Sequence, residues 1–271
     1  MALDIFQYII LGIIQGITEW LPISSEGMLV IAKAQLFKDP TPLAEFIKIT
    51  LFLHLGTFFA ALVYLRKNVL HLIKTLFSYK KAEDSLKKLL NFLIVSTVIS
   101  GIIGYIILTS ISGAEEKIAV TGKVITLLVG FLLLGTASIQ LRARSLGYKD
   151  SSKLNKFDSL LLGIGQGISA LPGVSRSGIT SSLLLLRNFD KKEALRISFL
   201  MSLPIVLAGN IVLNIGLFSS ISLAAVLGLI ASFIFGLATI HGMMKLAEKI
   251  NFGWFVFIIA VLTIISGLFL K

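Results

Sequence analysis

Residues 12–27 of the chain read GIIQGITEWLPISSEG, and residues 163–178 repeat the pattern as GIGQGISALPGVSRSG. The two stretches start and end in register, and a single-residue gap in each aligns both the Gln-Gly-Ile and the Leu-Pro segments. Each copy has an apolar lead-in, a Leu-Pro break, a hydroxyl cluster ending in glycine, and a second apolar run. Because proline interrupts helices, each copy predicts two short helices joined by a break.

The composition around the two copies is that of a membrane protein. The 271 residues are 56% hydrophobic and 14% charged, whereas soluble domains are about 25% charged. The mean hydropathy is +0.94, and apolar runs near the ~20 residues needed to cross a bilayer recur along the chain. Such spans must be helices, since the alternating segments of a large β-barrel do not occur. We predict an all-α polytopic membrane protein.

The basic character of the chain has a topological explanation. Its net charge is +11, but Lys and Arg gather in short segments between apolar runs, as the positive-inside rule requires. We therefore expect no nucleic-acid partner. The chain has no cysteine, which excludes disulfides and thiolate metal sites.

The predicted plan is one membrane domain over residues 1–271 with two repeats. Repeat one covers about 1–141, repeat two covers about 157–271, and a basic linker at 142–156 joins them. Each repeat starts with two half-length helices that we interpret as a re-entrant hairpin, the alternative being one kinked span. The hairpins are expected at 1–38 and 157–187. Six full spans are expected at 45–65, 89–110, 122–141, 197–214, 221–243 and 252–270, and an interfacial segment at 68–88.

The orientation follows from the basic loops, which we place inside at 66–88, 142–156, 187–196 and 245–249. The six spans then alternate without conflict, and both termini lie outside the plasma membrane. Three spans per repeat is an odd number, so the two repeats are inverted relative to one another. Inverted repeats with broken helices usually place their site near the midplane, between the repeats.

Two charged side chains lie inside these otherwise apolar hairpins. Glu19 and Arg176 would each cost ~2.5–3.5 kcal/mol at the bilayer centre. One interpretation is a buried ion pair that only joins the two hairpins. We favour a functional one, because hydroxyl groups surround the guanidinium and each hairpin restarts a helix just after its serine cluster. Arg, hydroxyls and helix N-termini together suit a phosphate or diphosphate. The predicted anion ligands are Arg176, Ser24, Ser175, Ser177 and Thr180.

The first hairpin carries different chemistry. Gln15 and Glu19 are four residues apart and share one helical face. Glu19 can ligate Mg²⁺ or Ca²⁺ on a diphosphate, or act as general acid or base. Ser24 and Ser25 can cap a helix or supply a nucleophile. Glu26 is either a second metal ligand or a carboxylate that complements the helix dipole.

Other polar residues within the spans carry smaller expectations. His54 is interpreted as a hydrogen-bonded packing residue rather than a catalytic one, and Trp20 as a packing residue. Asn210 and Asn214 are expected to make interhelical hydrogen bonds.

The two motifs resemble those of the undecaprenyl-diphosphate phosphatase family of the bacitracin-resistance type. That family carries a (Glu/Gln)-x-x-x-Glu segment, then Leu-Pro-x-Ser-Ser-x-Gly-His, and later Pro-Gly-x-Ser-Arg-Ser-Gly. Here Gln15 to Glu19 and LPISSEGM at 21–28 correspond to the first, and PGVSRSG at 172–178 matches the second fully. The resemblance extends to HLGT at 54–57 and FLMSLP at 199–204.

The resemblance implies a membrane phosphatase that cleaves a polyprenyl diphosphate to the monophosphate on the outer face. It usually acts with a divalent cation, Mg²⁺ or Ca²⁺, and recycles the lipid carrier for envelope or glycan synthesis. Glu19 and Gln15 would serve the metal or acid–base role. Ser25 would be the nucleophile, and Arg176 with its serines would hold the diphosphate. The expected partners are the polyprenyl diphosphate and the bilayer, and a homodimer is left open.

Two departures bear on the mechanism. The family's usual His is Met28 here, and Glu26 replaces the hydroxyl before Gly27. A thioether cannot relay a proton, so a mechanism that needs that His is closed to this chain. Three alternatives stay open: Ser25 attacks with Glu19 or Glu26 as base, a metal-bound water attacks, or hydrolysis is weak or lost. The last would leave a flippase or binder of phosphorylated polyprenol.

Overall fold

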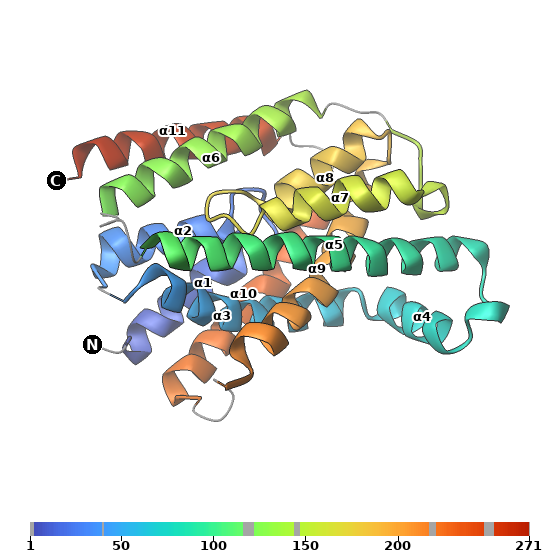
Figure 1. Ribbon diagram of the computed structural model, residues 1–271, viewed down its shortest axis with the longest axis horizontal. Coiled ribbons are helices and arrows are strands. Elements are labelled where there is room, and N and C mark those ends of the chain that lie inside the picture. The colour runs from blue at the N-terminus through green and yellow to red at the C-terminus, as the bar shows by residue number, and fades with distance from the viewer. Residues whose placement is uncertain are drawn as a thin grey trace.

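The fold is a bundle of helices, shown in Figure 1. The computed structural model describes residues 3–39, 41–115, 122–143, 147–216, 221–246 and 252–270, and within them every regular element is helical apart from one isolated bridge between Lys149 and Phe189. The α-helices are α1 (Ile5–Thr18), α2 (Ser25–Ile31), α3 (Leu43–Tyr64), α4 (Arg66–Phe77), α5 (Asp84–Glu115), α6 (Gly122–Arg142), α7 (Lys156–Ile168), α8 (Arg176–Leu186), α9 (Lys191–Asn214), α10 (Leu223–Leu246) and α11 (Phe252–Phe269). A π-helix, η1 (Ala32–Phe37), continues α2, and η2 (Tyr79–Lys81) and η3 (Ser151–Lys153) are short 3-10 helices. The predicted all-α fold is confirmed.

Five of the described helices are long and apolar enough to cross a membrane: α3, α5, α6, α9 and α10. They correspond to five of the six predicted spans, so a multi-pass membrane protein is confirmed. The sixth predicted span, 252–270, corresponds to α11, which has 18 residues and falls among the shorter apolar helices. A helix of that length covers ~27 Å, a little less than the ~30 Å hydrocarbon core. Its full crossing stays a prediction.

The two predicted hairpins are present as paired short helices. In Figure 1, α1 and α2 lie in the left half of the molecule, α7 and α8 lie in the right half, and their turns approach each other near the centre. Helix α1 packs along α10, while α7 packs along α5, and α6 packs against α11. These pairings are the ones that a two-fold relation between the predicted repeats would produce. The inverted orientation and the re-entrant course stay predictions.

Local sequence explains where each hairpin begins. Asp4 caps α1 in a capping box with Gln7, and Asn155 caps α7 in a capping box with Asp158. Each box satisfies backbone N–H groups that the first helical turn leaves without partners. The first hairpin helix of each repeat therefore starts with the same device.

Glycine allows α1 and α10 to approach closely. A Cβ atom on Gly12 would lie 2.0 Å from the backbone oxygen of Gly228, which no side chain could tolerate without a shift. Gly163, at the corresponding position of α7, would bring a Cβ within 2.8 Å of Ile99 on α5. Small residues at such contacts are typical of membrane helix packing, where close backbone approach replaces a hydrophobic driving force.

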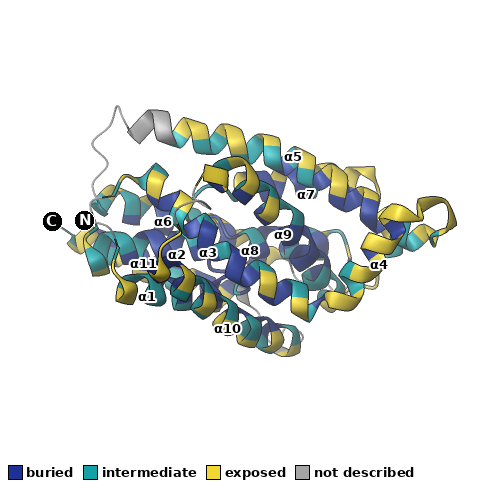
Figure 2. Cartoon of the chain, turned by 90° about the horizontal axis from the view of Figure 1, so that it is seen from below, coloured by how far each residue is buried: buried dark blue, intermediate teal, exposed yellow. Residues whose placement is uncertain are grey.

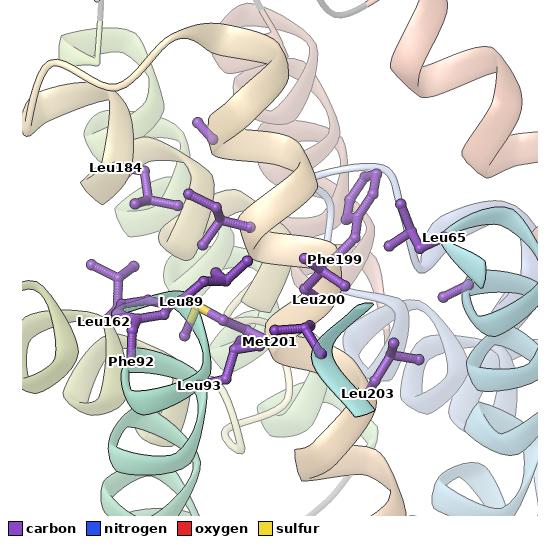
Figure 3. Packing of buried hydrophobic residues seen from close by; sticks show 14 of the residues in the cluster. Leu65, Leu89, Phe92, Leu93, Leu162, Leu184, Phe199, Leu200, Met201 and Leu203 are labelled. Atoms are coloured by element: carbon purple, nitrogen blue, oxygen red, sulfur yellow. The ribbon is translucent and has the colours of Figure 1, made fainter. Parts of the chain in front are cut away.

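A hydrophobic core joins the second hairpin to α3, α5 and α9, and Figure 3 shows its packing. Phe92, Leu162 and Leu184 come from three different helices and are almost fully buried. Trp20 belongs to this core and packs edge-on against Phe199 with ring centroids 4.8 Å apart, which confirms its packing role. Figure 2 shows buried residues gathered along α3 and α9, with exposed ones along α4 and the outer side of α5. The core thus fixes α9 against the end of α1.

Polar side chains tie α9 to α3. Asn210 donates to the carbonyl oxygen of Leu51 at 2.9 Å, and Asn214 donates to that of Lys48 at 2.9 Å. Both predicted interhelical hydrogen bonds are confirmed. Within a membrane such bonds satisfy polar groups that lipid cannot.

The predicted interfacial segment contains α4 and η2. Leu70, Ile73 and Phe77 are exposed on α4 among its basic residues, as expected of a helix at a membrane surface. Residues 144–146 of the predicted linker and 247–249 of the last basic loop lie outside the described residues.

The close approach of α1 and α10 predicts a stability difference between two glycine substitutions. Gly12→Ala should destabilise the protein by about 1–3 kcal/mol through overpacking, although alanine is the better helix former by ~1 kcal/mol. Gly135→Ala on α6 is the control, because nothing lies within 4 Å of its added Cβ. Thermal unfolding in detergent measures both. An unfolding temperature for Gly12→Ala equal to or above that of Gly135→Ala would contradict the described packing.

Candidate active site

The turns of the two hairpins contact each other directly. The hydroxyl oxygen of Ser24 accepts the backbone N–H of Gly173 at 3.0 Å. Ser177 donates to the carbonyl oxygen of Leu21 at 3.1 Å. The two breaks, far apart in the sequence, therefore form one centre.

The same turns start the second helix of each hairpin. Ser24 caps α2 by accepting the N–H of Gly27, and Ser175 caps α8 by accepting the N–H of Gly178. Ser24 and Gly173 both have positive φ, at 59° and 102°. Glycine adopts that conformation readily, whereas serine does so at a cost that is typical of functional sites.

A buried ion pair joins the two turns. One carboxylate oxygen of Glu19 binds the guanidinium of Arg176, and the exposed fractions of the two side chains are 4% and 13%. Arg176 also donates to the carbonyl oxygen of Ser198 on α9 at 3.3 Å and lies over the ring of Trp20. The predicted charges thus neutralise each other where lipid would make either one costly.

Three polar side chains contact the second carboxylate oxygen of Glu19. Ser25 donates to this Oε2 atom at 2.7 Å, and Gln15 donates to it at 2.9 Å. The Nε2 atom of His54 lies 3.3 Å from the same oxygen. A serine hydroxyl on a carboxylate is the contact that a nucleophile makes with its base.

Glu26 lies in the first turn of α2, apart from this group of contacts. Both of its carboxylate oxygens are 2.9 Å from the hydroxyl of Thr50 on α3. Within the described residues, no group of three or more His, Asp or Glu side chains is arranged to hold a metal ion. A cation at Glu26 would therefore need ligands from another source.

The remaining predicted anion ligands take different positions. Ser175 and Ser177 line the central cavity, with hydroxyls 3.4 Å apart. Thr180 is fully buried, donates to the carbonyl oxygen of Arg176 and contacts Ser198. Thr180 and Gln15 are not among the described residues that line the cavity, and Gln15 contacts the site through its hydrogen bond to Glu19. The roles predicted for these side chains stay predictions.

His54 makes the hydrogen-bonding contact predicted for it, since its Nδ1 atom lies 2.8 Å from the carbonyl oxygen of Thr50. The sequence did not indicate that its side chain also reaches Glu19 and lines the cavity. A lone histidine in an apolar span does not reveal which helix face it occupies. The one sequence feature that could have indicated a place in the site is its position in the HLGT stretch at 54–57, which belongs to the family resemblance.

The cavity that these residues close has a volume of about 490 Å³. Its polar end holds Glu19, Ser25, Glu26, His54 and Arg176. Mostly apolar residues of α5 and α9 line much of the rest, together with residues of α3 and of the second hairpin. Several of the cavity-lining side chains of α5 and α9 are more than half exposed: Ile102, Tyr105, Ile106 and Val212. The charged end is thus connected to an open, apolar groove.

Comparison with known proteins identifies the family of this chain. The model of the family described as "Bacitracin resistance protein BacA" matches residues 8–265. The chain belongs to this family. Its BacA relatives include a protein named undecaprenyl-diphosphatase from Methanococcoides burtonii, 39% identical over 97% of this chain and 98% of the relative. Another of that name, from Methanothrix thermoacetophila, is 37% identical over 97% of this chain and 96% of the relative. A third protein of that name, from Haloarcula marismortui, is 35% identical over 96% of this chain and 94% of the relative.

The ion pair of this BacA family member predicts strong coupling between its two members. Glu19→Gln and Arg176→Gln should each destabilise the protein by about 3–5 kcal/mol, because each leaves a buried charge without its partner. The double variant should lose less than the sum of the two, since it removes both members of the pair together. Unfolding in detergent measures the cycle.

Asp84→Asn is the control for loss of one carboxylate. Its side chain is 89% exposed in a surface pair with Lys87, so its unfolding should match that of the wild type. Additive losses from Glu19→Gln and Arg176→Gln would contradict the contact between them.

Proposed function

We propose that the chain hydrolyses a polyprenyl diphosphate of the undecaprenyl type to the monophosphate and phosphate, which returns the lipid carrier to envelope or glycan synthesis. The observation that carries this proposal is one cavity that combines a charged, hydroxyl-rich end with an apolar groove. A diphosphate on a long apolar chain has the same two parts. The names of the three relatives agree with it, and none supports the flippase alternative.

The contacts within the site suggest how the reaction proceeds. Arg176, which lies in the first turn of α8, would bind the terminal phosphate together with Ser175 and Ser177. The hydroxyl of Ser25, already 2.7 Å from Glu19, would attack the terminal phosphorus as its proton passes to that carboxylate. The bridging P–O bond breaks, its electron pair leaves on the lipid monophosphate, and that oxygen takes the proton from Glu19. A water molecule, deprotonated by the regenerated Glu19 carboxylate, then attacks the phosphoserine. The Oγ–P bond breaks, phosphate leaves, and Oγ of Ser25 takes back the proton from Glu19.

The expected divalent cation is part of the proposal. Glu26 lines the cavity and accepts a hydrogen bond from Thr50. Its two carboxylate oxygens have further lone pairs that could bind a cation. Mg²⁺ is typically held by one or two carboxylates together with substrate phosphates, and Glu26 fits that pattern. Glu19 fits less well, because both of its oxygens are occupied. When bound, the cation would neutralise charge on the diphosphate.

The proposed orientation keeps both termini and the cavity mouth outside. The start of α1 and the end of α11 lie at the same end of the molecule, opposite α4, in both overall views (Figures 1 and 2). The cavity residues of α5 come from its later part, between Ser100 and Leu108, away from its connection to α4. If the basic helix α4 lies inside, the cavity opens toward the outer leaflet. The homodimer stays a prediction.

Phosphate release from undecaprenyl diphosphate in detergent tests the proposed function. We expect turnover by the wild type and a decrease in kcat of about 1,000-fold or more in Ser25→Ala. The reason is that a nucleophile and its base act as one unit, so loss of the nucleophile abolishes the contribution of both. Ser138→Ala is the matched control, since this serine is exposed on α6 and donates to a carbonyl of its own helix. No phosphate release by folded wild-type protein would overturn the proposal. Equal rates for Ser25→Ala and wild type would remove the serine mechanism alone.

A further inference from the structure

His54 lies at the polar end of the cavity, and the steps described so far give it no part. It is the one of the chain's three histidines that lines the cavity. Met28, at the position where the related motif has its His, is not among the described lining residues. The imidazole available to this site therefore comes from α3.

Both ring nitrogens of His54 face oxygen atoms. Nδ1 lies 2.8 Å from the carbonyl oxygen of Thr50, one turn earlier in α3. A carbonyl can only accept, so Nδ1 carries a proton and the ring is held in a fixed plane. Nε2 lies 3.3 Å from the Oε2 atom of Glu19. Donation from both nitrogens is satisfied only by the imidazolium.

The charges of the site then balance. Glu19 and Glu26 supply two carboxylates, and Arg176 and His54 supply two cations, all lining one cavity. Without His54, two carboxylates would face one guanidinium, and an incoming diphosphate would meet an excess of negative charge. At short range in a partly buried site such repulsion is only weakly screened.

We propose that His54 is the positioning residue of this site, holding the Oε2 atom of Glu19 toward Ser25 and supplying the second positive charge near the diphosphate. This inference rests on the proposed phosphatase reaction. As the hydroxyl of Ser25 attacks phosphorus, its proton moves to Glu19, and the Nε2–H of His54 stays hydrogen-bonded to that carboxylate. The imidazole neither gains nor loses a proton in this step.

The second contribution of His54 concerns binding. Glu19 is already paired with Arg176 in this structure, so the guanidinium must be shared when an anion arrives. A second cation bound to Glu19 allows Arg176 to turn toward phosphate without leaving the carboxylate alone in an apolar surrounding. Loss of the imidazole should therefore affect KM as well as kcat.

Two substitutions separate these contributions. His54→Leu removes both the donor and the charge, and should lower kcat by about 100-fold, the effect of losing one preorganised donor. His54→Gln keeps an amide donor for Glu19 but no charge. It should recover most of the lost kcat while KM for undecaprenyl diphosphate stays raised by about tenfold. A purely packing role would not produce this split.

The control and the folding check use the same assay. His71→Gln should match the wild type, because His71 is exposed on α4 and does not line the cavity. Thermal unfolding in detergent identifies any variant that fails to fold, and His54→Gln keeps the test valid if His54→Leu does not fold. The inference is overturned if a folded His54→Leu has wild-type kcat and KM, or if His54→Gln recovers none of the lost kcat. An inactive wild type would instead overturn the proposed function.

Discussion

The ion pair between Glu19 and Arg176 is the interaction on which the rest of the structure depends. Each charge belongs to a different half of the chain, and neither could remain in an apolar interior alone. Their pairing requires that the two helix breaks meet, which the hydrogen bond from Gly173 to Ser24 then completes. The close contacts of α1 with α10 and of α7 with α5 bring the two turns to one place.

The geometry of the pair also determines what the site can do. One oxygen of Glu19 pairs with the guanidinium of Arg176, while the other accepts from Ser25 and Gln15 and faces His54. A single carboxylate thus couples the group that would bind phosphate to the group that would attack it. In the proposed reaction the two turns contribute unequally, because the first would supply the base and the nucleophile and the second would supply the cation. The apolar groove between α5 and α9 adds a place for a lipid chain next to these groups.

Most of the fold and part of the site follow from the sequence, for physical reasons. Charges inside apolar hairpins are costly, so Glu19 and Arg176 stood out, and the Leu-Pro breaks marked both turns. Side-chain direction was harder to predict. Thr180 faces α9 rather than the cavity, because its position on α8 turns it toward Ser198. His54 reaches the site because α3 packs against α1, a tertiary contact that hydropathy cannot reveal. The π-helix at Ala32–Phe37 likewise left no signal in the apolar pattern.

The central claim is that the two turns form one buried centre, and the absence of cysteine from the chain gives a clean background for testing it. Leu21→Cys and Ser177→Cys can be combined, because the hydrogen bond from the Ser177 side chain to the backbone of residue 21 places the two residues in contact. After treatment of native membranes with a short bifunctional thiol reagent, which does not need disulfide geometry, mass spectrometry should find peptides containing residues 21 and 177 joined by the reagent. Leu21→Cys combined with Ser78→Cys, at the end of α4, should give no such product. Failure of the first pair to cross-link in folded protein would contradict the account.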